Sequence, residues 1–407
     1  MLAPPSSNPT RMPWGFVASL SLAQLVSWGS VFYAFALFMT PMSVELGWTK
    51  PELTAAYSLG LVASGICAVP AGRLIDLGYG RHVMTGGSLL AALLLALWSQ
   101  VQSLPLFMAL WIGLGATMSA ILYEPGFAVL TFRLGPLARH AITFMTLVGG
   151  LASTVFIPLT HLLIEAFGWR GALLVLAAVN LGVCALIHAL VIPPVARPEG
   201  VSARVPAPPS GARRVLRQAA FWGFVGTCVL QGMISTGIPI HLIPLLVERG
   251  MALDGAVAIY ALIGPAQVAA RFGIALGGQR LNLKLVGLVT MALTVLSVSL
   301  LPWLAQGWAV AVAAALVWGA SNGLMTILRA LLPPDLFGRE DYGAIQGLIG
   351  MPVTFAKASA PFAFGALWAW SGGYEAVVSV WIALALGAAA CFAATLLAAR
   401  KISSASL

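Results

Sequence analysis

The chain has 407 residues, of which 60% are hydrophobic and only 8% are charged. Soluble globular proteins carry about 25% charged residues, so the composition excludes an ordinary globular fold. The net charge of +9 comes from basic residues spread over short connections between apolar stretches. This distribution excludes the dense basic patch that is typical of a nucleic-acid-binding protein.

Apolar runs of about 20 residues, the length that crosses a bilayer as a helix, recur along the whole chain. Their continuity excludes a barrel, whose strands would alternate apolar and polar residues. We predict an all-α integral membrane protein with twelve transmembrane helices in two six-helix bundles. The predicted spans are 14–39, 53–75, 83–101, 105–131, 140–166, 171–193, 219–247, 255–277, 284–303, 308–331, 342–367 and 374–399.

The stretch 194–218 is the main break between spans, because it is rich in Pro, Ala and Arg and lacks apolar periodicity. It divides the spans six and six. The apolar run after the Pro-rich head is too long for a cleaved signal, so we interpret it as the first span. The predicted parts are a cytoplasmic head (1–13), a first bundle (14–193), a cytoplasmic linker (194–218), a second bundle (219–400) and a cytoplasmic tail (401–407).

Basic residues outside the spans fall almost entirely on one side of the predicted membrane, and only Lys50, Arg170 and Arg249 fall on the other. The positive-inside rule then places both termini in the cytoplasm. Arginine outnumbers lysine, as in proteins of GC-rich bacterial genomes. We therefore expect a multi-pass protein of the bacterial cytoplasmic (inner) membrane.

The connection 72–82, between the second and third spans, reads GRLIDLGYGRH. It resembles the signature loop of the major facilitator superfamily, roughly G-x-x-x-D-R-x-G-R-R, and Gly72, Asp76 and Arg81 match that pattern. Leu77 stands where the family has arginine, and Tyr79 stands where it has glycine. The resemblance implies two pseudo-symmetric bundles that alternate in access to the two sides of the membrane.

Asp76 ends a helix and can accept hydrogen bonds from the positive N-terminus of the eleventh span, near Tyr342–Ala344. Arg133, at the end of the fourth span, would add a salt bridge. The resemblance implies that Gly72, Asp76, Arg81 and Arg133 form a conformational latch. The alternative is a solvated acidic residue that only helps to orient the chain.

The stretch WGSVFYAF (28–35) and the following Leu46-Gly47-Trp48 are similar to the monocarboxylate and oxalate–formate carrier group. Oxalate–formate antiporters carry an arginine in the eighth span and a lysine in the eleventh, positions that correspond here to Arg271 and Lys357. The resemblance therefore implies an anion carrier. Animal monocarboxylate carriers place an Asp one turn before this arginine, where this chain has Gln267.

The charges of Arg271 and Lys357 lie within apolar spans, and a cation at the centre of a bilayer costs at least about 2.5 kcal/mol. Gln267 and Arg271 share one helical face, and Gln346 shares a face with Lys357, so both faces should turn towards the bundle interior. The planar fork of arginine suits a carboxylate, and lysine adds a point charge. The alternative is that each cation pairs internally or that Arg271 extends to cytoplasmic water.

Further polar residues of the spans are candidates to line the same cavity. Glu124 is the candidate for proton coupling, because a carboxyl buried in apolar surroundings can carry a proton; the alternative is a structural partner of a buried cation. The predicted substrate-binding residues are Arg271, Lys357, Gln267, Tyr123, Gln24, Trp28, Gln231, Asn322 and Gln346.

These patterns predict a secondary active transporter of a small mono- or dicarboxylate, working by anion exchange or proton coupling. The alternative is an efflux carrier of a drug-like or inorganic solute, in which the buried cations are structural. No phosphate loop, paired-carboxylate site or HExxH motif is present, so we expect no enzyme activity, cofactor or metal. The expected partners are an anionic solute and the lipid bilayer, with no nucleic acid, and we expect a monomer.

Overall fold

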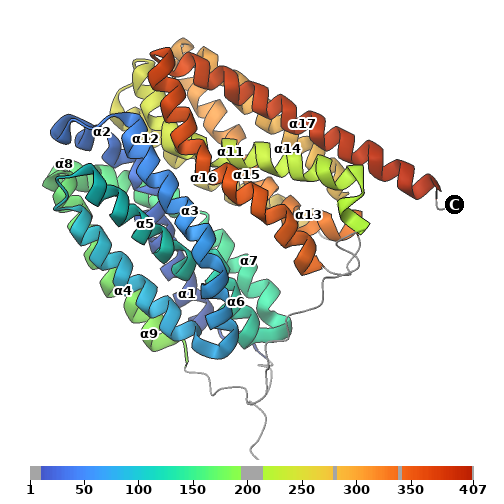
Figure 1. Ribbon diagram of the computed structural model, residues 1–407, viewed down its shortest axis with the longest axis horizontal. Helices are drawn as coiled ribbons and strands as arrows, with labels where there is room; N and C mark the ends of the chain where they lie inside the picture. Colours follow the sequence, from blue (N-terminus) through green and yellow to red (C-terminus); the bar gives the residue numbers. More distant parts are fainter. Residues whose placement is uncertain (1–10, 194–213, 278–281, 338–341, 406–407) are drawn as a thin grey trace, which may run out of the picture. The chain divides into compact units, whose positions relative to one another are not determined.

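The computed structural model describes residues 11–193, 214–277, 282–337 and 342–405, and all regular elements within them are helical (Figure 1). The first half of the chain forms α1 (Trp14–Ser27), η1 (Trp28–Tyr33), α2 (Phe35–Leu46), α3 (Lys50–Leu74), η2 (Ile75–Tyr79), α4 (Gly80–Trp98), α5 (Leu104–Ile121), α6 (Tyr123–Leu134), η3 (Gly135–Leu137), α7 (Ala138–Gly149), α8 (Ala152–Val179), η4 (Asn180–Ala185) and α9 (Leu186–Val191). The second half forms α11 (Ala219–Glu248), α12 (Leu253–Ala261), α13 (Ile263–Gly277), α14 (Leu283–Leu300), η6 (Leu301–Gln306), α15 (Trp308–Phe337), α16 (Tyr342–Ser371) and α17 (Tyr374–Ala405).

Ten of the described helical stretches are long and apolar enough to cross a membrane. One of them, His140–Val191, has 52 residues, more than twice the length that a bilayer needs. Gly168 interrupts it with a left-handed φ of 68°, between the predicted fifth and sixth spans. Dividing this stretch at Gly168 and adding the 30-residue α16 accounts for the twelve predicted spans. The predicted all-α membrane fold is confirmed.

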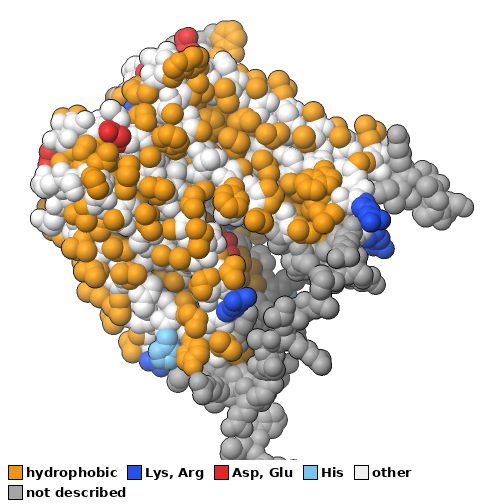
Figure 2. All heavy atoms as spheres, in the orientation of Figure 1, with side chains coloured by type: hydrophobic (Ala, Val, Ile, Leu, Met, Phe, Trp, Pro, Cys, Tyr) orange, Lys and Arg blue, Asp and Glu red, His pale blue; other side chains and the backbone are white. Residues whose placement is uncertain are grey.

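The outer surface of these helices is apolar, as a surface against lipid must be. On α4, Leu89, Leu90, Leu93 and Leu97 are 42–55% exposed and follow one another at helical spacing. Apolar side chains cover most of the face that Figure 2 shows. These exposed leucines form the lipid-facing stripe of the helix.

The chain divides into two compact units. The first comprises Met1–Trp48 and Leu59–Val201, and the second comprises Thr49–Ser58 and Ser202–Leu407. The beginning of α3 therefore belongs with helices of the second half of the chain. Within the second unit, the backbone amide of Phe362 donates a hydrogen bond to Ser58 Oγ over 3.1 Å. The domain bounds drawn from the sequence stay a prediction.

Small residues allow close helix crossings inside each unit. In the first unit, a methyl group on Gly115 of α5 would overlap the backbone of Gly60 on α3. In the second unit, a methyl group on Gly323 of α15 would come within 2.6 Å of the carbonyl oxygen of Gln267 on α13. The second crossing holds α13 against α15 beside the predicted cationic residue of α13.

Candidate functional site

Arg271 of α13 is held against α15 in the second unit, and it is only 8% exposed. Its Nη2 atom donates to Gln267 Oε1 over 3.2 Å and to Thr326 Oγ1 of α15 over 3.5 Å. Gln267 is one helical turn earlier on the same face and is 4% exposed. The structure thus brings together two of the predicted substrate-binding residues and fixes the guanidinium between a side-chain amide and a hydroxyl.

Lys357 of α16 faces α11 in the same unit. The position that a Cβ atom of Gly232 would take on α11 is 3.3 Å from Lys357 Cγ and 3.7 Å from Lys357 Cε. A larger residue at 232 would therefore meet the lysine stem. The absence of a side chain on Gly232 leaves room for Lys357 to lie along the surface of α11.

Arg329 of α15 is a third cation of this unit, and the sequence patterns did not select it for the site. Its Nη2 atom is 3.8 Å from the position that a Cβ atom of Gly350 would take on α16. The guanidinium of Arg329 therefore lies beside α16.

Three basic side chains of the second unit, Arg271, Arg329 and Lys357, therefore come from α13, α15 and α16. Guanidinium groups bind carboxylates with two parallel hydrogen bonds, whereas an ammonium acts as a point charge. Side chains of these types are suited to holding an anion.

Three other predicted substrate contacts belong to this unit: Gln231, Asn322 and Gln346. Gln231 of α11 is 1% exposed, and its Nε2 atom donates to Thr294 Oγ1 of α14 over 2.9 Å. Thr294 Oγ1 in turn lies 2.6 Å from Ser321 Oγ of α15. Gln231 therefore joins three helices, and its role as a substrate contact stays a prediction. Asn322 is half-buried on α15, and the side chain of Gln346 lies outside the described residues.

Gln24 of α1 serves the backbone of the first unit. Its Nε2 atom donates to the carbonyl oxygens of Ile121 and Leu122 over 2.8 and 3.0 Å. The donor that would normally pair with the Ile121 carbonyl is the amide of residue 125, which is Pro125 and has none. Gln24 is fully buried and replaces that donor. These hydrogen bonds stabilise the α5–α6 break, and the role of Gln24 as a substrate contact stays a prediction.

Trp28 and Tyr123 lie together in the first unit, with ring centroids 4.9 Å apart. Tyr123 also stacks on Phe127, at 5.2 Å. Trp28 begins η1, a wider π-helical turn of the kind that often marks functional positions. Trp28 Nε1 is a buried donor with no hydrogen-bond partner among the described residues. Both residues stay predicted substrate contacts.

Glu124, at the start of α6, is exposed. Its role in proton coupling stays a prediction. The helix begins at Tyr123 because Leu122 is extended, with φ −83° and ψ −157°. The first turn of α6, where a carboxylate favours the helix dipole, therefore holds Glu124.

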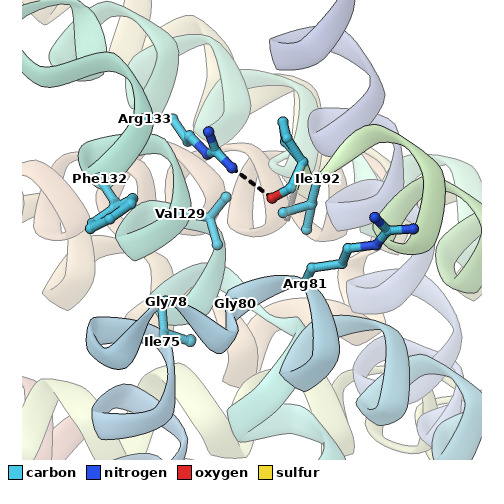
Figure 3. A pocket seen from close by; sticks show the side chains of 9 residues that line it. Ile75, Gly78, Gly80, Arg81, Val129, Phe132, Arg133 and Ile192 are labelled. Atoms are coloured by element: carbon cyan, nitrogen blue, oxygen red, sulfur yellow. Dashed lines mark hydrogen bonds between the residues drawn. The ribbon is translucent and has the colours of Figure 1, made fainter. Parts of the chain in front are cut away.

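The predicted latch residues lie around η2 in the first unit. A small cavity of about 20 Å³, the volume of roughly one water molecule, is lined by Gly78, Gly80, Arg81 and Arg133, among others (Figure 3). Arg133 Nη2 donates to the carbonyl oxygen of Pro193 over 2.6 Å. The side chain of Asp76 lies outside the described residues. The salt bridge to Asp76 and the role of Gly72 therefore stay predictions.

A polar cluster at the start of α3 was not selected from the sequence. Lys50 Nζ lies 3.5 Å from the ring centroid of Trp368 on α16. Trp368 Nε1 donates to Glu248 Oε2 of α11 over 2.7 Å, and the Tyr374 amide donates to Glu248 Oε1 over 2.8 Å. Only the isolated position of Lys50 in an otherwise weakly basic outer side marked it in the sequence.

His241 of α11 belongs to the neighbourhood of this cluster. Its Nδ1 atom lies 2.9 Å from the Tyr374 hydroxyl, and its Nε2 atom lies 3.1 Å from the Pro361 carbonyl oxygen. It is completely buried. His241 therefore ties α11 to α16 and α17.

The profile of the Major Facilitator Superfamily matches residues 20–361. Monocarboxylate transporter 11 of Homo sapiens is 26% identical over 388 residues, covering 90% of this chain and 72% of the human protein. The Mus musculus protein of the same name is 27% identical over 367 residues, covering 84% of this chain and 73% of the mouse protein.

Solved structures resemble the fold. A mutant form of the nucleoside transporter NupG has a TM-score of 0.74 at 15% identity and covers 94% of this chain and 98% of its own. A bacterial homologue of the human lysosomal transporter Spinster, in an inward-facing and occupied conformation, has a TM-score of 0.63 at 13% identity, covering 98% of both chains. Identities this low establish the shared fold alone.

Proposed function

Because this chain belongs to the Major Facilitator Superfamily and is therefore a secondary transporter, we propose that the solute it carries is a small organic anion held by Arg271 and Lys357. The burial and the orientation of Arg271 are the main support for this proposal. Arg271 is buried in a membrane helix, where a charge is costly, and is held by two neutral acceptors, Gln267 and Thr326. A guanidinium oriented in this way can donate hydrogen bonds to a carboxylate without first changing its conformation.

The relatives support the same class of solute. Two proteins named as monocarboxylate transporters match this chain over most of its length. Lys357 adds a second positive charge from α16 of the same unit, lying along α11 at Gly232. Because the two cations come from different helices, one can keep its bond to the anion while the helix that carries the other moves.

Transport by this site works either by exchange for a second anion or by cotransport of a proton. Glu124, at the start of α6, is the candidate for proton coupling. A pH gradient imposed on proteoliposomes separates the two modes. Proton coupling requires uptake that follows the gradient in the wild type and loses that response in Glu124→Gln, whereas anion exchange is indifferent to both changes.

The experiment that tests the solute class is counterflow in proteoliposomes with labelled oxalate, formate, lactate and pyruvate. Wild type is compared with Arg271→Gln and Lys357→Gln, and the exposed Lys284 of α14 provides the matched control Lys284→Gln. We expect saturable exchange in the wild type and the control, and its loss in both site variants. Exchange that survives both site changes would make the cations structural, and the absence of any exchange would favour the efflux carrier.

Orientation and location are part of the proposal. The distribution of basic residues favours cytoplasmic termini in a bacterial inner membrane. Reporter fusions at the C-terminus test this directly: an enzyme that is active only in the cytoplasm should work there, and one that is active only outside the cytoplasmic membrane should not.

A further inference from the structure

His241 is completely buried in α11, and both nitrogens of its ring have partners on other helices of the second unit. Nε2 lies 3.1 Å from the carbonyl oxygen of Pro361 on α16, and Nδ1 lies 2.9 Å from the hydroxyl of Tyr374 on α17. The ring of Phe364 meets the imidazole edge to face, with the centroids 6.4 Å apart. The unit therefore holds a titratable ring away from water, with a polar partner at each nitrogen.

The two partners determine where the imidazole carries a hydrogen. A carbonyl oxygen only accepts, so Nε2 carries a hydrogen and donates it to Pro361. In the neutral ring, Nδ1 then has a lone pair and accepts the hydrogen of the Tyr374 hydroxyl. A second proton would enter at Nδ1, and the hydrogen bond with Tyr374 would have to reverse its direction. Protonation of His241 thus changes the bonding of Tyr374 and leaves the bond to Pro361 in place.

Tyr374 is also one of the two residues over which Lys50 lies. The ammonium is 4.9 Å from the ring centroid of Tyr374 and 3.5 Å from that of Trp368. One buried aromatic side chain therefore separates the positive charge of Lys50 from Nδ1 of His241. Two positive charges on either side of a buried ring repel each other, because little water screens them. A proton on His241 and the ammonium of Lys50 therefore disfavour each other.

Other charged side chains lie on α11 and on the helices that pack against it. They are Glu248 and the adjacent Arg249 of α11, Asp254 of α12, Arg329 and Asp335 of α15, Lys357 of α16, and Glu375, Arg400 and Lys401 of α17. Glu248 contacts the residues beneath Lys50, and both of its carboxylate oxygens already accept hydrogen bonds. Its charge attracts the ammonium and a proton on His241 alike, so it does not favour one over the other. Lys50 is the charged group that Tyr374 links directly to the imidazole.

The contact made by Lys50 is the first part of a longer seam between α3 and α16. The position that a Cβ atom of Gly365 would take is 2.5 Å from Thr54 Oγ1, and the amide of Phe362 donates to Ser58 Oγ over 3.1 Å. Lys50, Thr54 and Ser58 follow one another at intervals of four residues, so they form one stripe of α3. Release of Lys50 would therefore free one end of this stripe from α16.

We infer that His241 is a proton-binding site that controls the contact between α3 and α16. A proton on its imidazole displaces Lys50 from the rings of Tyr374 and Trp368 and releases the start of α3. By linkage, removing Lys50 makes the proton easier to bind. An imidazole in water is half-protonated at about pH 6.5, so the contact is kept at pH 8 and weakened at pH 5.5. This inference depends neither on the proposed solute nor on Glu124.

The test measures how fast a cysteine at position 54 reacts with a water-soluble maleimide in nanodiscs. Thr54 is completely buried, so Thr54→Cys reacts when the start of α3 is released. Its rate is divided by that of Glu375→Cys, whose side-chain position is 87% exposed, which removes the direct effect of pH on the thiol. Both changes are made in protein whose partly exposed Cys67 and Cys391 are replaced by serine.

If only the released state binds the proton, the rate ratio should rise about tenfold between pH 8 and pH 5.5. In His241→Gln, whose amide can still donate to the Pro361 carbonyl, the ratio should not change with pH. Lys50→Met should raise the ratio at pH 8 and reduce its rise to less than about threefold, since the repulsion is gone. The control Lys284→Met, at the exposed start of α14, should respond as the unchanged protein does.

A ratio that is independent of pH while His241 is present overturns the inference, even if His241→Gln does not fold. An equal rise in His241→Gln overturns it as well, because another group would then carry the proton. A rise in Lys50→Met as large as with Lys50 present would show that the two charges are not linked. The assay contains no carboxylate, so a failure of the proposed function leaves these outcomes unaffected.

Discussion

The ammonium of Lys50, at the first residue of α3, lies 3.5 Å from the ring centroid of Trp368 on α16 and 4.9 Å from that of Tyr374 on α17. Trp368 Nε1 and the Tyr374 amide both donate to the carboxylate of Glu248. The cation therefore lies over the faces of two rings, and the indole N–H of one of them is bound by a carboxylate. A cation over an indole ring is among the stronger interactions of this kind.

Replacing Lys50 by methionine keeps the aliphatic stem and removes the charge. We expect Lys50→Met to lower Tm in detergent, and a double-mutant cycle with Trp368→Leu to give a coupling of about 1 kcal/mol, the value for a partly buried cation–π pair. The control is Lys284→Met on the exposed start of α14. A coupling indistinguishable from zero would mean that the pair contributes no stability.

Removing an acceptor of Arg271 should weaken anion binding without removing the cation. We expect Gln267→Leu to raise KM for the transported carboxylate about fivefold. The Arg271 guanidinium would lose a hydrogen bond that helps to hold it in position. Thr326→Val should have a smaller effect, since that contact is 3.5 Å rather than 3.2 Å. Transport assays on these variants and on Gln102→Leu, in an exposed connection, check the order. An unchanged KM in Gln267→Leu would mean that Arg271 needs no such support.

The hydrogen bonds of Gln24 should matter for stability and not for the solute. In Gln24→Leu the buried carbonyl of Ile121 loses the donor that Pro125 cannot supply, which costs about 1–3 kcal/mol. We therefore expect a lower Tm with unchanged carboxylate affinity. Gln100→Leu, at an exposed position, should change neither. A loss of carboxylate affinity with unchanged Tm would indicate that Gln24 contacts the substrate.

The crossing of α3 and α5 offers a matched pair of glycines on one helix. A methyl group on Gly115 would overlap the backbone of Gly60, whereas a methyl group on Gly113 would meet only the flexible end of Leu94. We expect Gly115→Ala to reduce the yield of folded protein strongly and Gly113→Ala to have a small effect, as measured by gel filtration in detergent. Equal behaviour of the two variants would show that the helices separate at little cost.

The fold was predictable because lipid imposes simple rules on a sequence. Long apolar runs can only be helices, and the runs here gave both their number and their approximate ends. The breaks within spans were harder to find. Pro125 indicates one of them, but the location of the break at Leu122 depends on the donor that Gln24 brings from α1.

The site was only partly predictable, because helical spacing tells which residues share a face and not which helix the face meets. Gln267 and Arg271 share a face, and the structure pairs them. Gln231 has the same polar character, yet its face meets Thr294 and is fully packed. Arg329 was missed for the converse reason: its position near a helix end favours water, and only the contact with Gly350 shows its actual direction.

The membership of Thr49–Ser58 in the second unit makes the two halves of the gene product interdependent. If the chain were cut within 194–213, the C-terminal fragment would lack the residues that place a cation over Trp368 and a hydroxyl at the amide of Phe362. A plasmid encoding that fragment alone should therefore yield an incompletely packed polypeptide. Co-expression of both fragments should be required for its maturation, so a split at this boundary would function as an obligate complementation pair.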